Sequence, residues 1–100
     1  MIPLKLTELA TLLDGAQPAK EIDISGIVTD SRKAGRGCLF AALPGTRVDG
    51  HDYADTAIKL GAVALLVSRP LDVTVPQLVV DDVLQALGRI GTLIRDRVDP

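Results

Sequence analysis

Two short polar segments, separated by one apolar run, carry the side chains best suited to chemistry in this sequence. They are Thr29-Asp30-Ser31-Arg32 and Thr46-Arg47-Val48-Asp49-Gly50, and the run Cys38 to Leu43 lies between them. Hydroxyls, backbone amides and an arginine near the ends of a strand can hold a polar small molecule. The Ser31 hydroxyl can donate and accept hydrogen bonds, and the forked guanidinium of Arg47 suits a phosphate. The two segments are therefore a candidate binding site.

The residues alone leave a simpler interpretation open for both segments. Asp30 to Arg32 is also typical of an ordinary turn, in which Asp30 caps backbone amides and Arg32 is solvated. The glycine-bounded stretch Gly45 to Gly50 is typical of a connector between a strand and a helix. It is not a phosphate loop, because no Gly-Lys-Ser/Thr sequence follows it.

Other reactive residues occur singly. Cys38 heads an apolar run and is predicted to be a small buried side chain rather than a nucleophile. We expect His51 to be a solvated residue at a helix entrance rather than a catalytic base. The Asp81-Asp82 pair suits the start of a helix. The sequence therefore predicts no catalytic constellation and no metal site.

Length and composition favour one folded domain over residues 1–100. The chain has 100 residues, of which 47% are hydrophobic, so it can bury a single core. Phe40 and Tyr53 are its only aromatic residues. We expect an aliphatic core, with stacking on aromatic rings nearly unavailable. There is no room for an ATP-binding domain as well.

Charge and hydropathy patterns exclude several classes of partner. Eleven basic and thirteen acidic residues give a net charge of -2 and are spread along the chain, which does not favour nucleic-acid binding. The apolar run from Gly61 to Val67 is far shorter than the roughly 20 residues that span a bilayer. The first residues lack a signal-peptide pattern, so we expect a cytoplasmic protein without membrane insertion.

Hydrophobic periodicity and turn residues predict the elements that must position the candidate site. Two helices are predicted: one from Leu6 to Leu13, ended by Asp14-Gly15, and one from His51 to Leu60, ended by Gly61. Tyr53, Ala54, Ala57 and Ile58 share one face of the second helix. Strands are predicted at 22–28, 38–43, 62–67 and 77–80.

The strand–helix–strand order from Cys38 to Val67 predicts a parallel pair of strands. A turn between Pro70 and Pro76 should follow, and then a closing helix with Asp82 and Gln85 at capping-box spacing. We expect Gly88 and Gly91 to allow this helix to pack closely on the sheet. The predicted fold class is α/β, a small mixed sheet with a parallel βαβ core and about three helices.

The same motifs resemble a known family. The Asp30-Ser31-Arg32 turn, followed by Pro44-Gly45 and then Asp49-Gly50, is similar to the amino-terminal domain of the ATP-dependent Mur ligases. The resemblance covers nearly the whole chain. Residues 66–72 and 76–80 look more like the member that adds D-alanyl-D-alanine than like the diamino-acid-adding member.

The resemblance implies a ligand and a set of site residues. The ligand would be the uridine nucleotide of a UDP-N-acetylmuramoyl-tripeptide, a peptidoglycan precursor. The uracil and ribose would be bound by Thr29, Ser31, Thr46, Arg47 and Val48. The pocket would be shaped by Asp30, Arg32, Asp49 and Gly50.

The resemblance also implies that this chain is only part of an enzyme. A full-length ligase would use ATP and Mg²⁺ on a separate ATP-binding domain, which would be this chain's partner, and the 100 residues alone would be inactive. Two alternatives stay open. One is the same domain of the diamino-acid-adding ligase, and the other is a non-catalytic module for nucleotide sensing or protein interaction.

Overall fold

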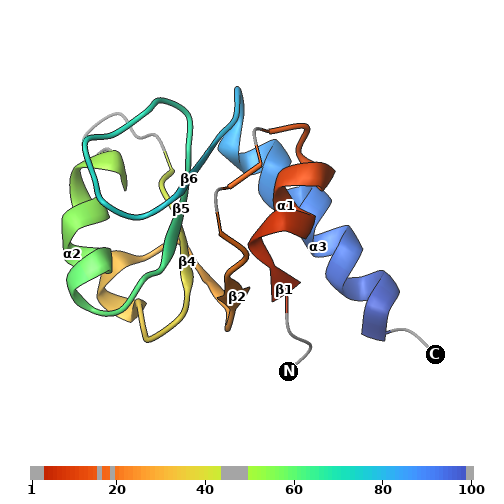
Figure 1. Ribbon diagram of the computed structural model, residues 1–100, viewed down its shortest axis with the longest axis horizontal. Helices are drawn as coiled ribbons and strands as arrows, with labels where there is room; N and C mark the ends of the chain where they lie inside the picture. Colours follow the sequence, from red (N-terminus) through yellow and green to blue (C-terminus); the bar gives the residue numbers. More distant parts are fainter. Residues whose placement is uncertain (1–3, 16, 19, 44–49, 99–100) are drawn as a thin grey trace.

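The chain folds around a parallel sheet that is covered by helices on both faces (Figure 1). The computed structural model describes residues 4–15, 17–18, 20–43 and 50–98. In this part of the chain, the sheet runs in the order β3 (Ile27–Val28), β4 (Leu39–Ala41), β5 (Ala64–Val67) and β6 (Gln77–Val79). Every neighbouring pair is parallel. The predicted α/β class with a parallel βαβ core is confirmed.

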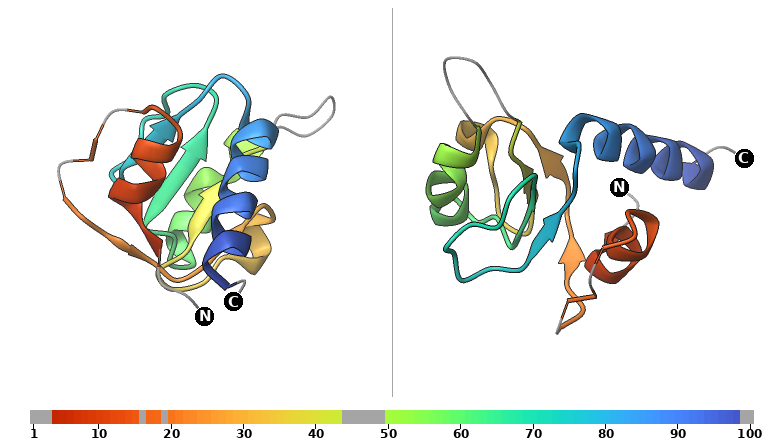
Figure 2. Two further views of the ribbon diagram at one scale, coloured as in Figure 1. Left: turned by 90° about the vertical axis from the view of Figure 1, so that its right-hand side faces the viewer. Right: turned by 90° about the horizontal axis from the view of Figure 1, so that it is seen from above.

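Helices form a layer on each side of this sheet (Figure 2). One side holds α1 (Leu6–Leu12) and α3 (Val83–Val98), which contact each other. The other side holds α2 (Ala54–Lys59) and the short 3-10 helices η1 (Ser31–Lys33) and η2 (Gly50–Tyr53). No helix within the described ranges is both long and apolar enough to cross a membrane.

Successive side chains of the central strands pack into two separate apolar cores, one on each face of the sheet. In β4, Leu39 and Ala41 pack toward α1 and α3, whereas Phe40 packs toward α2. In β5, Leu66 and Leu65 divide in the same way. Burial on both faces explains why these strands appear in the sequence as continuous apolar runs rather than as an alternating pattern.

The strand predicted at 22–28 is instead two strands in two different sheets. β2 (Asp23–Ile24) pairs antiparallel with β1 (Leu4–Lys5), which the sequence analysis missed, and β3 pairs parallel with β4. The chain changes sheet at Ser25-Gly26. There the Ser25 amide and hydroxyl donate to the carbonyls of Gly37 and Arg36, both at 2.9 Å. These bonds to a distant turn interrupt the strand.

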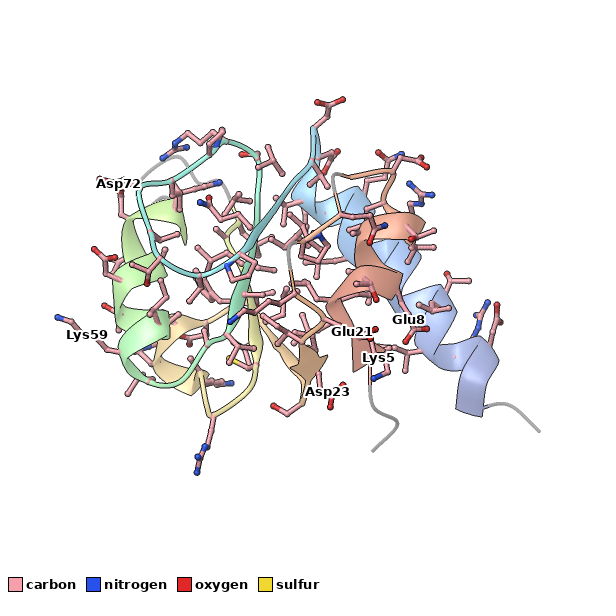
Figure 3. All side chains as sticks on the ribbon, viewed as in Figure 1. Lys5, Glu8, Glu21, Asp23, Lys59 and Asp72 are labelled. Atoms are coloured by element: carbon pink, nitrogen blue, oxygen red, sulfur yellow. The ribbon has the colours of Figure 1, made fainter. Side chains whose placement is uncertain are left out.

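Exposed polar contacts hold β1 and the start of α1 beside β2 (Figure 3). Lys5 Nζ lies 3.1 Å from the Asp23 carboxylate, and the Thr7 hydroxyl donates to Glu21 at 2.8 Å. The hydrogen bond to Asp23, with the nearby negative charges of Asp23 and Glu21, raises the pKa of Lys5. Because these pairs are solvated, they fix orientation more than they add stability.

Turn residues end the helices largely as predicted. Gly61 follows α2 with a φ of +120°, a backbone conformation that favours glycine. Asp14 after α1 also has a positive φ, of 58°. At the start of α3, the Asp82 carboxylate accepts a hydrogen bond from the Gln85 amide at 3.0 Å, which confirms Asp82 as the cap.

The predicted role of Gly88 and Gly91 in close packing is wrong. Both residues are exposed in α3, and a Cβ at either position would meet nothing within 4 Å. The sheet-facing side of the helix is formed by other residues, among them Val83, Ala86 and Ile90.

Replacing Gly88 with alanine should therefore stabilise the protein. Alanine in a helix interior is favoured over glycine by about 0.5–1 kcal/mol, chiefly because glycine loses more backbone entropy on folding. A urea titration should show a higher midpoint with an unchanged slope. Destabilisation would mean that this face of α3 packs against something in solution.

Candidate functional site

A pocket of about 540 Å³ lies at the carboxyl ends of β3 and β4, beside η1, η2 and α2. Parallel strands end at the same edge of a sheet, so the segments that follow β3 and β4 meet there. Five predicted site residues line the pocket: Thr29, Asp30, Ser31, Arg32 and Gly50. Four lining residues were missed: Phe40, Leu43, Tyr53 and Thr56.

The other four predicted residues, Thr46, Arg47, Val48 and Asp49, lie outside the described residues. The residues on either side of positions 44–49 belong to the described part of the chain. Leu43 and Gly50 both line the pocket, and the Gly50 amide donates to the Leu43 carbonyl at 2.7 Å. The last described residue before positions 44–49 and the first one after them thus both lie at the pocket.

Asp30 and Arg32 form a tight pair on the pocket wall. The Asp30 carboxylate accepts from the Arg32 amide at 3.0 Å, from Nε at 3.1 Å and from Nη2 at 3.0 Å. The side-chain hydrogen bond with Arg32 lowers the pKa of Asp30, and the same bond raises the pKa of Arg32. Asp30 therefore stays ionised at neutral pH. The ordinary turn in which Asp30 caps a backbone amide, the simpler interpretation of this segment, is therefore present. The same Asp30 carboxylate holds the Arg32 side chain beside the pocket.

Ser31 differs from its two neighbours because its side chain is buried. The residue is 7% exposed and lines the pocket. Its hydroxyl makes no hydrogen bond within the described part of the chain, where every fully buried side-chain nitrogen or oxygen has a partner. The hydroxyl oxygen is therefore not fully buried, and the residue lines the pocket. A sheltered hydroxyl with unused donor and acceptor capacity is well placed to bind a ligand.

Both aromatic residues of the chain, Phe40 and Tyr53, line this pocket. Phe40 is 1% exposed and forms part of the pocket floor and of the core beneath α2. Tyr53 is 42% exposed. It belongs to η2 and, unlike Ala54 and Ala57, is not part of the buried core beneath α2, so a ligand in the pocket can reach it.

The prediction for His51 is also wrong, whereas that for Cys38 is confirmed. His51 is 4% exposed, and its Nε2 accepts a hydrogen bond from the Ser68 amide at 3.0 Å. Cys38 is free and buried beneath α2. Among the residues that the structure describes, no three His, Cys, Asp or Glu side chains are grouped so that they could hold a metal ion.

The fold and the match to a known family define the class of protein. Residues 23–93 match the model of the Mur ligase family, catalytic domain, and the chain belongs to the Mur ligase family. This stretch begins at β2, contains the entire parallel sheet and ends within α3.

The relatives point to one branch of the family more than to another. The UDP-N-acetylmuramoyl-tripeptide–D-alanyl-D-alanine ligase of Escherichia coli K12 is 46% identical over 98 residues, which are 98% of this chain and 22% of that protein. The UDP-N-acetylmuramoyl-L-alanyl-D-glutamate–2,6-diaminopimelate ligase of Halalkalibacterium halodurans is 41% identical over 92 residues, 87% of this chain and 19% of that protein.

A solved structure of a family member has the same fold as this chain. Crystal structure I of MurF from Acinetobacter baumannii superposes with a TM-score of 0.84 and 34% identity, over 99% of this chain and 22% of that one. The resemblance to the D-alanyl-D-alanine-adding type is thus confirmed. The chain spans about a fifth of the length of the relatives that it matches.

Proposed function

We propose that this chain is a substrate-recognition domain that binds the uridine nucleotide of UDP-N-acetylmuramoyl-tripeptide for a ligase that adds D-alanyl-D-alanine. The observation that carries the proposal is the Ser31 hydroxyl, which is sheltered at the pocket without a hydrogen-bond partner among the described residues. A uracil edge alternates carbonyl acceptors with an N–H donor, which suits a group that can both accept and donate.

The other lining residues supply complementary contacts. Tyr53 offers an aromatic face to the base, and Leu43 and Phe40 offer apolar surface to the base or ribose. The ion pair with Asp30 holds the Arg32 guanidinium in one orientation, and this group brings a positive charge to the pocket. Thr29 lines the same wall.

The segment that contains Thr46, Arg47 and Val48 would complete the pocket. Support comes from its two flanking residues, Leu43 and Gly50, which both line the cavity. In this proposal Arg47 contacts a phosphate and Val48 forms an apolar wall, while Asp49 and Gly50 shape the turn into η2. Thr46 adds a hydroxyl donor to the ribose.

The chemistry of ligation would take place on other domains of a longer protein. In the proposed enzyme, ATP and Mg²⁺ act on an ATP-binding domain, residues 1–100 supply recognition, and the whole works in the cytoplasm on peptidoglycan precursors. The residues described here form a binding site rather than a set of acids, bases and nucleophiles. The chain alone should therefore show no ligase activity.

One alternative has an observation in its favour. The diaminopimelate-adding relative is 41% identical, and a pocket that recognises only uridine would serve either ligase. The two enzymes would differ in the peptide that they accept. Activity of the full-length protein on a UDP-muramoyl-dipeptide with diaminopimelate, and not on the tripeptide with D-alanyl-D-alanine, would favour the alternative.

Replacing Ser31 with alanine should weaken binding of a uridine nucleotide roughly three- to tenfold, the effect of one lost hydrogen bond of about 0.5–1.5 kcal/mol. Isothermal titration with UDP measures this change, and thermal unfolding checks that the fold is retained. Thr74→Ala, at an exposed position in the loop after β5, is a matched control that should bind normally. Equal affinity of Ser31→Ala and the unmodified protein would refute the assignment of Ser31.

A further inference from the structure

One cation stands at the edge of the candidate pocket. Among the described residues that line it, Arg32 is the one basic side chain and Asp30 the one acidic side chain. The Arg32 side chain is 86% exposed, whereas Ser31 is 7% exposed and Phe40 is 1% exposed. The pocket therefore has an apolar floor, a sheltered hydroxyl and an exposed guanidinium at its rim. The proposed uridine site gives this guanidinium no defined partner in the ligand.

Asp30 orients the guanidinium along one of its edges. Nε at 3.1 Å and Nη2 at 3.0 Å donate to the two oxygens of the Asp30 carboxylate. The same carboxylate accepts from the Arg32 backbone amide at 3.0 Å. The backbone and the side chain of Arg32 are thus tied to one group, so the guanidinium keeps a defined plane although it is exposed to solvent.

The distal edge of the guanidinium is open. Such a group carries five N–H donors, and Asp30 accepts from Nε and from one hydrogen of Nη2. No other described residue accepts a hydrogen bond from Arg32. Both N–H groups of Nη1 and the second N–H of Nη2 therefore remain. The outward hydrogens of Nη1 and Nη2 are nearly parallel, which matches two oxygens of one phosphate group.

Net charge does not explain what Arg32 would bind. The Asp30–Arg32 pair is neutral as a whole, so general attraction of anions at this wall is weak. Lys33, the next residue of η1, is exposed and is not among the residues that line the pocket. Directed hydrogen bonds from a fixed plane are what the pair offers, and a phosphate can accept two of them at once.

Tyr53 relates this edge to the place of the base. The hydrogen bond and the charge of Asp30 are the main causes of the raised pKa of Arg32, and the Tyr53 phenol adds to the shift. Tyr53 therefore lies within electrostatic range of the guanidinium, and both side chains line the pocket. A base in contact with the Tyr53 ring would have its ribose and first phosphate close to Arg32.

We propose that Arg32, oriented by Asp30, binds the phosphate next to the ribose, and that the pocket thereby selects uridine nucleotides over uridine. Arg32 is the specificity-determining residue, and Asp30 is a positioning residue that acts through it. The base lies over the apolar floor, and the phosphates leave the pocket at its exposed rim. This inference rests on the proposed uridine site.

The test compares the affinities for UDP and for uridine, measured by isothermal titration at one pH and one salt concentration. Arg32→Gln should lower the affinity for UDP about tenfold and leave the affinity for uridine unchanged. Arg32→Lys keeps the charge but not the planar fork, so it should lose most of the same factor. Thermal unfolding checks that both variants are folded.

The matched control is Lys33→Gln. It removes one positive charge from the neighbouring exposed residue of η1, which does not line the pocket. At physiological salt a charge without direct contact is screened, so the ratio of the two affinities should stay within about twofold of the normal value. An equal loss of UDP affinity in Lys33→Gln would overturn the proposal, because the effect would then come from the general charge of η1.

A second measurement uses the unmodified protein. The Arg32 Nε–H, which is bonded to Asp30, gives an NMR signal that should shift on addition of UDP and stay in place with uridine. If Arg32→Gln does not fold, this signal decides the proposal, and the absence of a shift with UDP would overturn it.

The outcomes separate the role of Arg32 from the uridine site itself. If uridine binds and the ratio of the two affinities is unchanged in Arg32→Gln, the role of Arg32 fails and the uridine site stands. If neither ligand binds the unmodified protein, the uridine site fails and the role of Arg32 fails with it. A ratio that falls only in the Arg32 variants supports both.

Discussion

Replacing Gly50 with alanine is expected to weaken binding of a uridine nucleotide by more than about tenfold and to lower the free energy of unfolding by about 1–3 kcal/mol. A Cβ at this position would lie 2.6 Å from the Leu43 nitrogen, 2.8 Å from the Leu43 oxygen and 3.1 Å from the Ala42 carbonyl carbon. All three are backbone atoms at the end of β4 and cannot rotate away. The pocket wall itself must move.

The matched control for this change is Gly35→Ala. A Cβ at Gly35 would meet nothing within 4 Å, so that variant should keep both its affinity and its stability. Titration of the two variants with UDP, together with thermal unfolding, checks the prediction. Normal affinity of Gly50→Ala would show that the edge of the pocket formed by Leu43 and Gly50 takes no part in binding.

Replacing Gly61 with alanine should have the largest effect on stability, a loss of about 2–5 kcal/mol. Two penalties combine here. The φ of +120° costs a residue with a side chain about 1–3 kcal/mol, and a Cβ would lie 2.7 Å from the Arg36 Cα and 2.8 Å from its nitrogen. Gly61 also accepts a hydrogen bond from the Gly37 amide at 2.9 Å, so the turn before β4 would be displaced.

Denaturation in urea measures this loss, with Gly88→Ala as a control of opposite sign. The same substitution should destabilise the protein at the end of α2 and stabilise it in the middle of α3, because only the first site is crowded and has a positive φ. A Gly61→Ala variant within about 0.5 kcal/mol of the unmodified protein would contradict the close approach of this turn to Gly35 and Arg36.

The buried strands and the helix ends could be predicted because each has a local cause. Strands β4 and β5 are apolar throughout since both faces are covered, and Gly61 and Asp82 mark helix ends through backbone conformation and capping. The division at Ser25 has no local cause. It depends on hydrogen bonds to Arg36 and Gly37, eleven or more positions away, which periodicity does not reveal.

The candidate site could likewise be predicted only where the cause is local in the sequence. Thr29 to Arg32 were predicted because polar residues after a parallel strand gather at one edge of the sheet. Tyr53 was missed because it was assigned to the apolar face of a helix that begins at His51, whereas it belongs to η2, α2 begins only at Ala54, and Tyr53 is exposed. His51 was predicted to be solvated because its partner, Ser68, is 17 residues away and nothing near His51 in the sequence indicates the contact.

An NMR titration of the chain with UDP-N-acetylmuramic acid, with ATP as the control ligand, tests the central claim most directly. The proposed function predicts saturable shifts at Thr29 to Arg32, at the segment 44–50, and at Tyr53 and Thr56, with no comparable response to ATP. No shifts at millimolar UDP-N-acetylmuramic acid, or equal shifts with ATP, would contradict the claim that this pocket recognises the uridine nucleotide.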